Sequence, residues 1–264
     1  MFRRRNPRTT TVLPRAPRPF LEWPMVRLVQ WVLSIGLLVA LCAGFYRYLH
    51  TSPVFAVQWI RVERTHVLDP QVVLQASGIT TANNLFSLDL PTTRKAVEAL
   101  PYVKTCGIDR VFPNKVVLVV TERTPVATLL WNSRSFELDA EAVVLRELMP
   151  DAEHPGPLIT NVGGLDSPEL GMCLRETPAI KALEVWQAFM RTPVAQAIAA
   201  SELAAFSDNE IIMFCDELPF EIRWGRDDAA SQARRLNILW SEKRGEIHCK
   251  EYLDLRFGDD LICK

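Results

Sequence analysis

RVFPNKVVLVVTER, residues 110–123, is the stretch that most directly indicates how this chain folds. Its second part, residues 115–122, is rich in β-branched side chains, as a half-buried strand requires. The run before it, residues 103–111, has the same character, and Phe112-Pro113-Asn114 between the two runs is a turn signal. The sequence therefore predicts a β-hairpin over residues 103–122.

The segment upstream of this hairpin predicts one strand followed by two short helices. Residues 55–62 (FAVQWIRV) have the β-branched and aromatic content of a strand. Asp69-Pro70 then supplies a cap and a helix-starting proline for residues 71–77, and Gly78 ends that helix. A second helix is expected over residues 94–100, before Pro101. The order over residues 54–123 is thus β-α-α-β-β, with a predicted core of Val57, Ile60, Leu74, Val97, Leu100, Val103, Leu118 and Val120.

The N-terminal region predicts a membrane anchor. Residues 28–46 carry no formal charge, and as a helix they would span roughly 28 Å, the thickness of a hydrocarbon core. Residues 1–27 have a net charge of +6 and many prolines, whereas the chain after residue 47 has a net charge of −8. We expect a disordered cytoplasmic tail over 1–27, a retained helix over 28–46 and an extracytoplasmic body. A cleaved signal peptide is the alternative, but its basic region would be unusually long.

The 264-residue length leaves room for a second folded unit over residues 124–264. Strands are expected at 203–206, 210–215 and 220–224, and helices after Thr177-Pro178 and near 228–243. The final strand alternates: Tyr252, Asp254 and Arg256 point one way, and Leu253, Leu255 and Phe257 point toward the core.

Motifs for catalysis or cofactor binding are missing from the sequence. The four histidines are isolated, no HExxH, GxSxG or SxxK motif occurs, and Gly163-Gly164 lacks the context of a phosphate-binding loop. We therefore expect no enzymatic activity, no cofactor, no metal site, no small-molecule substrate and no nucleic-acid binding. Five cysteines follow the anchor, an odd number without CxxC spacing, which favours buried free thiols with at most one bridge.

The phrases NLFSLDL, LPYV, RVFPNKVVLVVTER and PVA, in this order behind the predicted anchor, resemble the POTRA domain of the FtsQ/DivIB family of bacterial cell-division proteins. Downstream, VATLLW, RSFELD and AVVLREL resemble the start of that family's second, β-rich domain. The ending EYLDLRFGDDLICK resembles its terminal strand. The chain departs from the family at Thr65, where a glycine is frequent, and over residues 165–176.

The resemblance implies an α+β fold: a single transmembrane helix, a POTRA domain over 54–123 and a mostly antiparallel β-rich domain with helices over 124–264. It also implies a non-enzymatic divisome scaffold that links early and late division proteins and controls assembly of septal peptidoglycan synthesis. The implied partners are FtsB and FtsL-like (DivIC-like) bitopic proteins and, indirectly, the septal peptidoglycan synthase. The implied location is the cell inner membrane at the septum, single-pass type II with periplasmic domains. Two alternatives remain: a POTRA component of a secretion or outer-membrane assembly system, and an anchored envelope enzyme.

Residues 252–262 are predicted to form the partner-binding edge. Because nothing long enough follows this strand to cover it, its backbone is expected to pair with a partner strand. Phe257 and Leu261 are the expected apolar anchors, and Arg256, in an exposed ion pair with Asp254, the expected charge contact. The alternative is that the strand is internal and these side chains only pack. The predicted site comprises Tyr252, Asp254, Arg256, Phe257, Gly258, Leu261 and Ile262.

Overall fold

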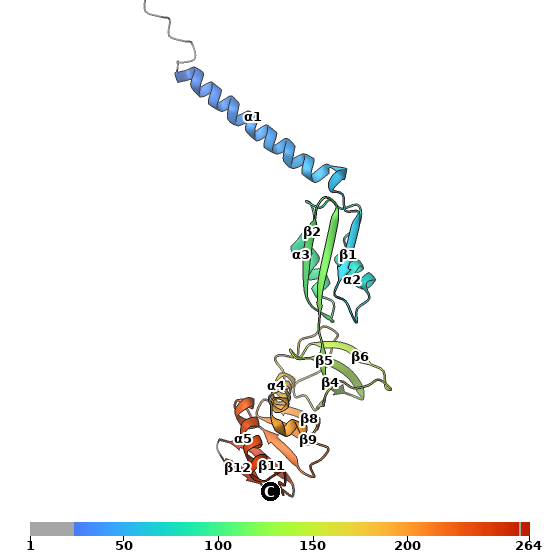
Figure 1. Ribbon diagram of the computed structural model, residues 1–264, viewed down its shortest axis with the longest axis vertical. Coiled ribbons are helices and arrows are strands. Elements are labelled where there is room, and N and C mark those ends of the chain that lie inside the picture. Colours follow the sequence, from blue (N-terminus) through green and yellow to red (C-terminus); the bar gives the residue numbers. More distant parts are fainter. Residues whose placement is uncertain (1–23, 259) are drawn as a thin grey trace, which may run out of the picture.

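The computed structural model describes residues 24–258 and 260–264, so most of the predicted tail over 1–27 lies outside the described residues. Figure 1 shows a long helix at one end, a small α+β unit next to it and a larger sheet with helices at the other end. The elements are α1 (Pro24–Thr51), η2 (Pro53–Phe55), β1 (Trp59–Glu63), α2 (Pro70–Ser77), α3 (Leu90–Glu98), β2 (Val103–Val111), β3 (Lys115–Glu122), β4 (Pro125–Trp131), β5 (Arg134–Asp139), β6 (Val144–Leu148), β7 (Leu158–Thr160), α4 (Pro178–Met190), η3 (Pro193–Gln196), β8 (Ala200–Ser207), β9 (Glu210–Cys215), β10 (Glu221–Trp224), α5 (Ala229–Glu242), β11 (Tyr252–Phe257) and β12 (Asp260–Cys263).

Helix α1 contains the whole predicted span and extends beyond it at both ends. Among the described residues it is the one helix long and apolar enough to cross a membrane, with a mean hydropathy of 2.2, and none of its most apolar window is buried. Between Arg27 and Arg47 its surface carries no formal charge on any side, which suits a hydrocarbon environment better than water. The helix ends at Thr51, and the backbone then turns through Ser52 and Pro53 into η2.

The first α+β unit has a three-stranded sheet in the order β1-β3-β2. Strands β2 and β3 form the predicted hairpin, and β1 runs parallel to β3. Asp69 caps α2 by accepting a hydrogen bond from the N–H of Gln71 at 2.8 Å, and Gly78 ends it with φ of 63°. Helix α3 starts at Leu90, earlier than predicted, because Asp89 is its cap and Pro91 lies in its first turn.

Two further details of this unit differ from the sequence prediction. Strand β1 starts at Trp59, not at residue 55, because Pro53 begins a short 3-10 turn there. On α2, Val73 is buried in the core, whereas Leu74 is only half-buried and lies outside it. An eight-residue helix has too few turns for its apolar spacing to fix which face is inward, so the prediction was one residue out of register.

The second unit is a nine-stranded sheet in the order β12-β11-β10-β9-β8-β7-β4-β5-β6. Most neighbouring strands are antiparallel, while β4–β7, β7–β8 and β10–β11 are parallel. Helices α4 and α5 contact each other, and they pack against β8 and β11 respectively. The overall class is α+β with an N-terminal apolar helix and a large mixed sheet, as the sequence predicted.

The C-terminal region forms two strands where the alternation predicted one. Strand β11 is internal, between β10 and β12, and Gly258 with φ of 54° lies in the turn to β12. Leu253 and Leu255 are buried as expected, but Phe257 is 52% exposed and is not a core residue. The register shift after Asp254 sets two β11 residues against one on β12 and breaks the regular alternation before Phe257.

Candidate functional site

Strand β12 forms one edge of the large sheet. In the part of the chain that the structure describes, no strand pairs with its outer side. The opposite edge, β6, is partly occupied: the N–H of Val144 donates to the carbonyl of Met172 at 2.9 Å, and its carbonyl accepts from Gly171 at 2.8 Å. Residues 171–173 thus cover the start of β6. The β12 edge is the more open of the two.

The pairing of β12 with β11 shows which backbone groups point outward. The N–H of Lys264 donates to the carbonyl of Tyr252 at 3.0 Å, so these residues form a hydrogen-bonded pair. In an antiparallel ladder such pairs alternate with non-bonded pairs, so Ile262 bonds to β11 and Cys263 does not. The same alternation turns the N–H and C=O of Cys263 and Leu261 toward the open edge.

Asp254 and Arg256 form a clamp on the sheet face next to this edge. Arg256 Nε and Nη2 donate to Asp254 Oδ1 at 3.0 Å and Oδ2 at 2.7 Å, and the Arg256 backbone N–H donates to Oδ1 at 3.0 Å. A Cβ at Gly225 would lie 2.8 Å from Arg256 Cγ, so the aliphatic stem of Arg256 lies directly over that glycine. Asp254 is only 2% exposed, so the prediction of an exposed ion pair was wrong. The sheet and the aliphatic stem of Arg256 shield the carboxylate.

The electrostatics agree with this geometry. Burial by itself raises the pKa of Asp254, but the hydrogen bonds from Arg256 outweigh it and lower the pKa below its ordinary value. Next to the clamp, the guanidinium of Arg223 stacks over the ring of Tyr252, 4.0 Å from Cζ to the ring centroid. Arg223 is itself held by Glu221 Oε1 at 2.7 Å. These contacts hold the polar side chains of this face in fixed positions.

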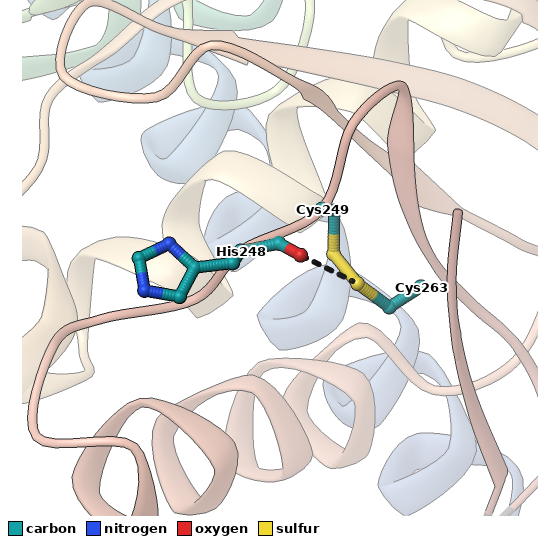
Figure 2. Close-up of a disulfide and its surroundings, with 3 residues drawn as sticks. All are labelled: His248, Cys249 and Cys263. Carbon is teal, nitrogen blue, oxygen red and sulfur yellow. Dashed lines mark hydrogen bonds between the residues drawn. A yellow bond between two sulfur atoms is a disulfide. The ribbon is translucent and has the colours of Figure 1, made fainter.

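A disulfide holds the end of the chain in place (Figure 2). It joins Cys249, which is buried in the loop before β11, to Cys263 on β12. The carbonyl of Lys264 also accepts hydrogen bonds from the N–H groups of Lys250 at 2.6 Å and Glu251 at 2.7 Å. The Cys263 sulfur lies 3.6 Å from the carbonyl of His248; a disulfide sulfur has no proton to donate, so this is a packing contact. The other described cysteines are free, Cys106 and Cys215 buried and Cys173 and Cys42 exposed.

The two folded units meet at a second polar cluster that sequence reasoning missed. Tyr102, at the start of the hairpin, is buried against Val143 and Leu145, and its hydroxyl donates to the carboxylate of Glu137. Arg146 Nη2 donates to the other oxygen of Glu137 at 2.7 Å. Burial, and then the hydrogen bond to Glu137, raise the pKa of Tyr102. The phenol therefore stays protonated and remains a donor.

The same joint contains a network of ion pairs. Arg123 Nη1 bonds to Asp139 at 2.5 Å and to Glu141 at 3.0 Å, and Lys104 Nζ lies 2.8 Å from Glu141. Burial alone lowers the pKa of Arg123, but the two carboxylates outweigh it and raise the pKa. Lys104, then Arg123, lower the pKa of Glu141 to about 2. No local spacing signals this network, because Lys104 and Arg123 belong to the first unit whereas Asp139 and Glu141 belong to the second.

The structure gathers the predicted site residues around one strand pair. Tyr252, Asp254, Arg256 and Phe257 lie on internal strand β11, and Gly258 lies in the turn. Leu261 and Ile262 lie on the edge strand β12. Leu261, predicted to be an apolar anchor, is half-buried against the domain core, whereas Ile262 and Phe257 are exposed. The Cys249–Cys263 bridge was the missing element; the cysteine count allowed one bridge but gave no pairing.

These features define a class: an α+β protein with an N-terminal apolar helix of membrane-spanning length, a small β-α-α-β-β unit and a large mixed sheet with one open edge. Residues 55–123 match the model of the POTRA domain, FtsQ-type. The chain is 25% identical over 88% of its length to the cell division protein FtsQ of Syntrophotalea carbinolica, covering 81% of that protein. It is 26% identical over 80% of its length to FtsQ of Myxococcus fulvus, covering 73% of it. Over 44% of its length it is 27% identical to the cell division protein DivIB of Clostridium tetani, covering 41% of that protein.

Residues 55–123 are thus similar to POTRA domains of the FtsQ type, and most of the chain is similar to cell division proteins named FtsQ. From here, residues 55–123 are called the POTRA domain and the nine-stranded unit the β domain.

Proposed function

We propose that this protein is a non-catalytic scaffold of the division machinery that binds a partner strand along β12. The partners are FtsB- and FtsL-like (DivIC-like) bitopic proteins, and through them the complex acts on the septal peptidoglycan synthase. The names of the relatives support a role in division. The outward backbone groups of the β12 edge are the observation that carries the binding mechanism.

The backbone and the side chains around the edge make different contributions to binding. Main-chain bonds to Leu261 and Cys263 supply affinity, since an added strand pairs with exactly such free groups. Exposed Phe257 and Ile262 offer apolar contacts, and the Arg256 side chain, 24% exposed and already oriented by Asp254, offers a fixed positive charge. Gly258 keeps the turn compact between the two strands.

The same proposal places the protein in the inner membrane with its N-terminus in the cytoplasm and its folded domains in the periplasm. The seven arginines before the span and the oxidised Cys249–Cys263 pair support this orientation. We expect the mature protein to retain residues 28–46. Mass spectrometry that finds an N-terminus near Ala43 or Gly44 would contradict the anchor.

Depletion of the protein in its own host, followed by microscopy, tests the role in division. The proposal expects filamentous cells with normally segregated nucleoids and few septa. Normal septation after full depletion would refute it. Turnover of cell-wall fragments by a purified fragment of residues 48–264 would instead indicate an anchored enzyme.

A further inference from the structure

The end of the POTRA domain next to α1 carries an exposed apolar surface, which we call the apolar tip: Val54, Phe55, Trp59, Phe86, Val111 and Phe112. Phe112, at the β2–β3 turn, is 60% exposed, and Trp59 at the start of β1 is 67% exposed. Val54 and Val111 are exposed as well. Hairpin turns in water are usually built from Gly, Asn, Asp and other polar residues, so an aromatic ring here needs an explanation.

Aromatic contacts join this tip to the end of α1. The ring of Tyr48 meets that of Phe55 edge-on, with centroids 6.5 Å apart. Phe55 meets Phe86 at 5.0 Å, also edge-on, and Phe86 meets Phe112 at 5.5 Å. The rings form a continuous path from the helix to the hairpin turn. Tyr48 on the helix and Trp59 in the tip belong to the two residue types that are enriched where proteins cross from hydrocarbon to water.

Hydrogen bonds hold the POTRA domain against the helix end. Asn84 Nδ2 donates to the carbonyl of Leu49 at 3.1 Å and to that of Ser52 at 3.3 Å. Ser52 is buried, and its N–H donates to the carbonyl of Tyr48 at 2.9 Å. The N–H of Leu85 donates to the carbonyl of Phe55 at 2.8 Å. The tip is therefore tied to the helix by contacts on both sides of the connection.

The distance from the hydrocarbon core follows from the length of the helix. The uncharged span ends at Tyr46, and the five further residues to Thr51 rise about 7.5 Å at ~1.5 Å per residue. The headgroup layer on each side of a bilayer is about 5 to 8 Å thick. The tip is connected to Thr51 through only Ser52 and Pro53, so its rings lie within reach of the headgroup layer.

We propose that the apolar tip lies in the lipid–water interface of the same bilayer that holds α1, with Phe112, Val54 and Trp59 against lipid. This rests on the membrane anchor proposed above. The contact continues the surface of α1 and gives the exposed aliphatic and aromatic groups an apolar environment. Together with the Asn84 hydrogen bonds, it fixes the POTRA domain at the membrane and keeps its two sheet edges, β1 and β2, upright above the surface.

Photocrosslinking of the full chain in phosphatidylethanolamine/phosphatidylglycerol nanodiscs tests this contact. p-Benzoylphenylalanine replaces Phe112, Leu38 in the middle of α1, or Phe206, a 47% exposed phenylalanine on β8 of the β domain. Irradiation and mass spectrometry then measure lipid adducts. We expect adducts at positions 38 and 112, and none at position 206.

The two controls separate the possible failures. Adducts at position 38 without any at 112 would overturn the proposal and leave the anchor intact. Adducts at neither position would refute the anchor and the tip contact together. In cells, an adduct at position 112 with a protein and not with lipid would also overturn the proposal, because a partner would then cover the tip.

A charge substitution gives a second readout. Phe112→Asp should keep the melting temperature, since the ring is mostly exposed, but should remove lipid adducts formed by p-benzoylphenylalanine at position 54. Phe206→Asp, the matched control, should leave those adducts unchanged. Undiminished adducts at position 54 in the Phe112→Asp variant would show that Phe112 does not hold the tip at the membrane.

Discussion

Removing the Cys249–Cys263 bridge should loosen the partner-binding edge before it unfolds the β domain. The bridge spans a sequence separation of 14 residues, and closing a loop of about 15 residues is worth about 3 kcal/mol through the lost entropy of the unfolded chain. Strand β12 has little else to hold it: three of its four residues are exposed, and only Leu261 packs against the core. Without the bridge, β12 should therefore open locally while the rest of the domain stays folded. This opening raises the entropy of the folded state as well as that of the unfolded state, so the measured loss of stability should be at most about 3 kcal/mol.

The variant to measure is Cys263→Ser in a fragment of residues 48–264, with Cys173→Ser, an exposed free cysteine, as the matched control. Denaturant unfolding should show a loss of about 1 to 3 kcal/mol for Cys263→Ser and no change for Cys173→Ser. Hydrogen exchange should speed up at residues 260–264 and stay slow in β9 and β10. A loss below about 0.5 kcal/mol with unchanged protection of β12 would refute this account of the edge.

Three further predictions concern the cores and the joint between the domains. Leu118→Ala should cost about 2 to 5 kcal/mol of POTRA stability in denaturant melts, because Leu118 is fully buried. Leu74→Ala, at a half-buried site, should cost clearly less. Equal losses would mean that the core is misassigned. Tyr102→Phe should weaken the joint by about 1.5 to 3 kcal/mol by removing the hydrogen bond to the Glu137 carboxylate, measured as faster exchange at 102–104 and 137–139; unchanged exchange there would contradict it. The pKa of Glu141 is lowered to about 2, so the stability that its ion pairs give the joint is complete above the ordinary carboxylate pKa of about 4.5 and is lost as the pH falls toward 2. Glu141→Gln should therefore make the stability of the joint depend less on pH over that range. An unchanged pH profile in this variant would contradict the prediction.

Local signals were enough to predict most elements. Asp69, Thr177 and Asp228 cap the helices that follow them, and a cap is a matter of a few neighbouring residues. The hairpin β2–β3 was predicted at its observed bounds because β-branched runs and a Pro-Asn turn specify it without help from the rest of the chain. The region around Phe55 was predicted to be a strand from its composition, but Phe55 lies in a 3-10 turn and its ring contacts Tyr48 at the end of α1.

The features that define the site depend on residues far apart in sequence. The burial of Asp254 requires Gly225, whose missing side chain leaves room for the stem of Arg256. The pairing of Cys249 with Cys263 requires the turn at Gly258, which brings β12 back beside β11. The joint requires Arg123 and Lys104 of one unit to meet Glu141 of the other. Periodicity carries no information about contacts between residues far apart in sequence, so these contacts could be identified only in the structure.

Binding of an FtsB-like partner to Leu261→Pro and Leu261→Ala variants of the full chain tests the central claim most directly. Proline removes the outward N–H of residue 261, whereas alanine removes the side chain and keeps the N–H. Pairing along β12 predicts that Leu261→Pro abolishes binding and that Leu261→Ala retains most of it. Both variants should stay folded, with similar small losses of melting temperature because each removes the packing of the Leu261 side chain against the core. Full binding by a folded Leu261→Pro variant would contradict the claim and would assign the partner to another surface.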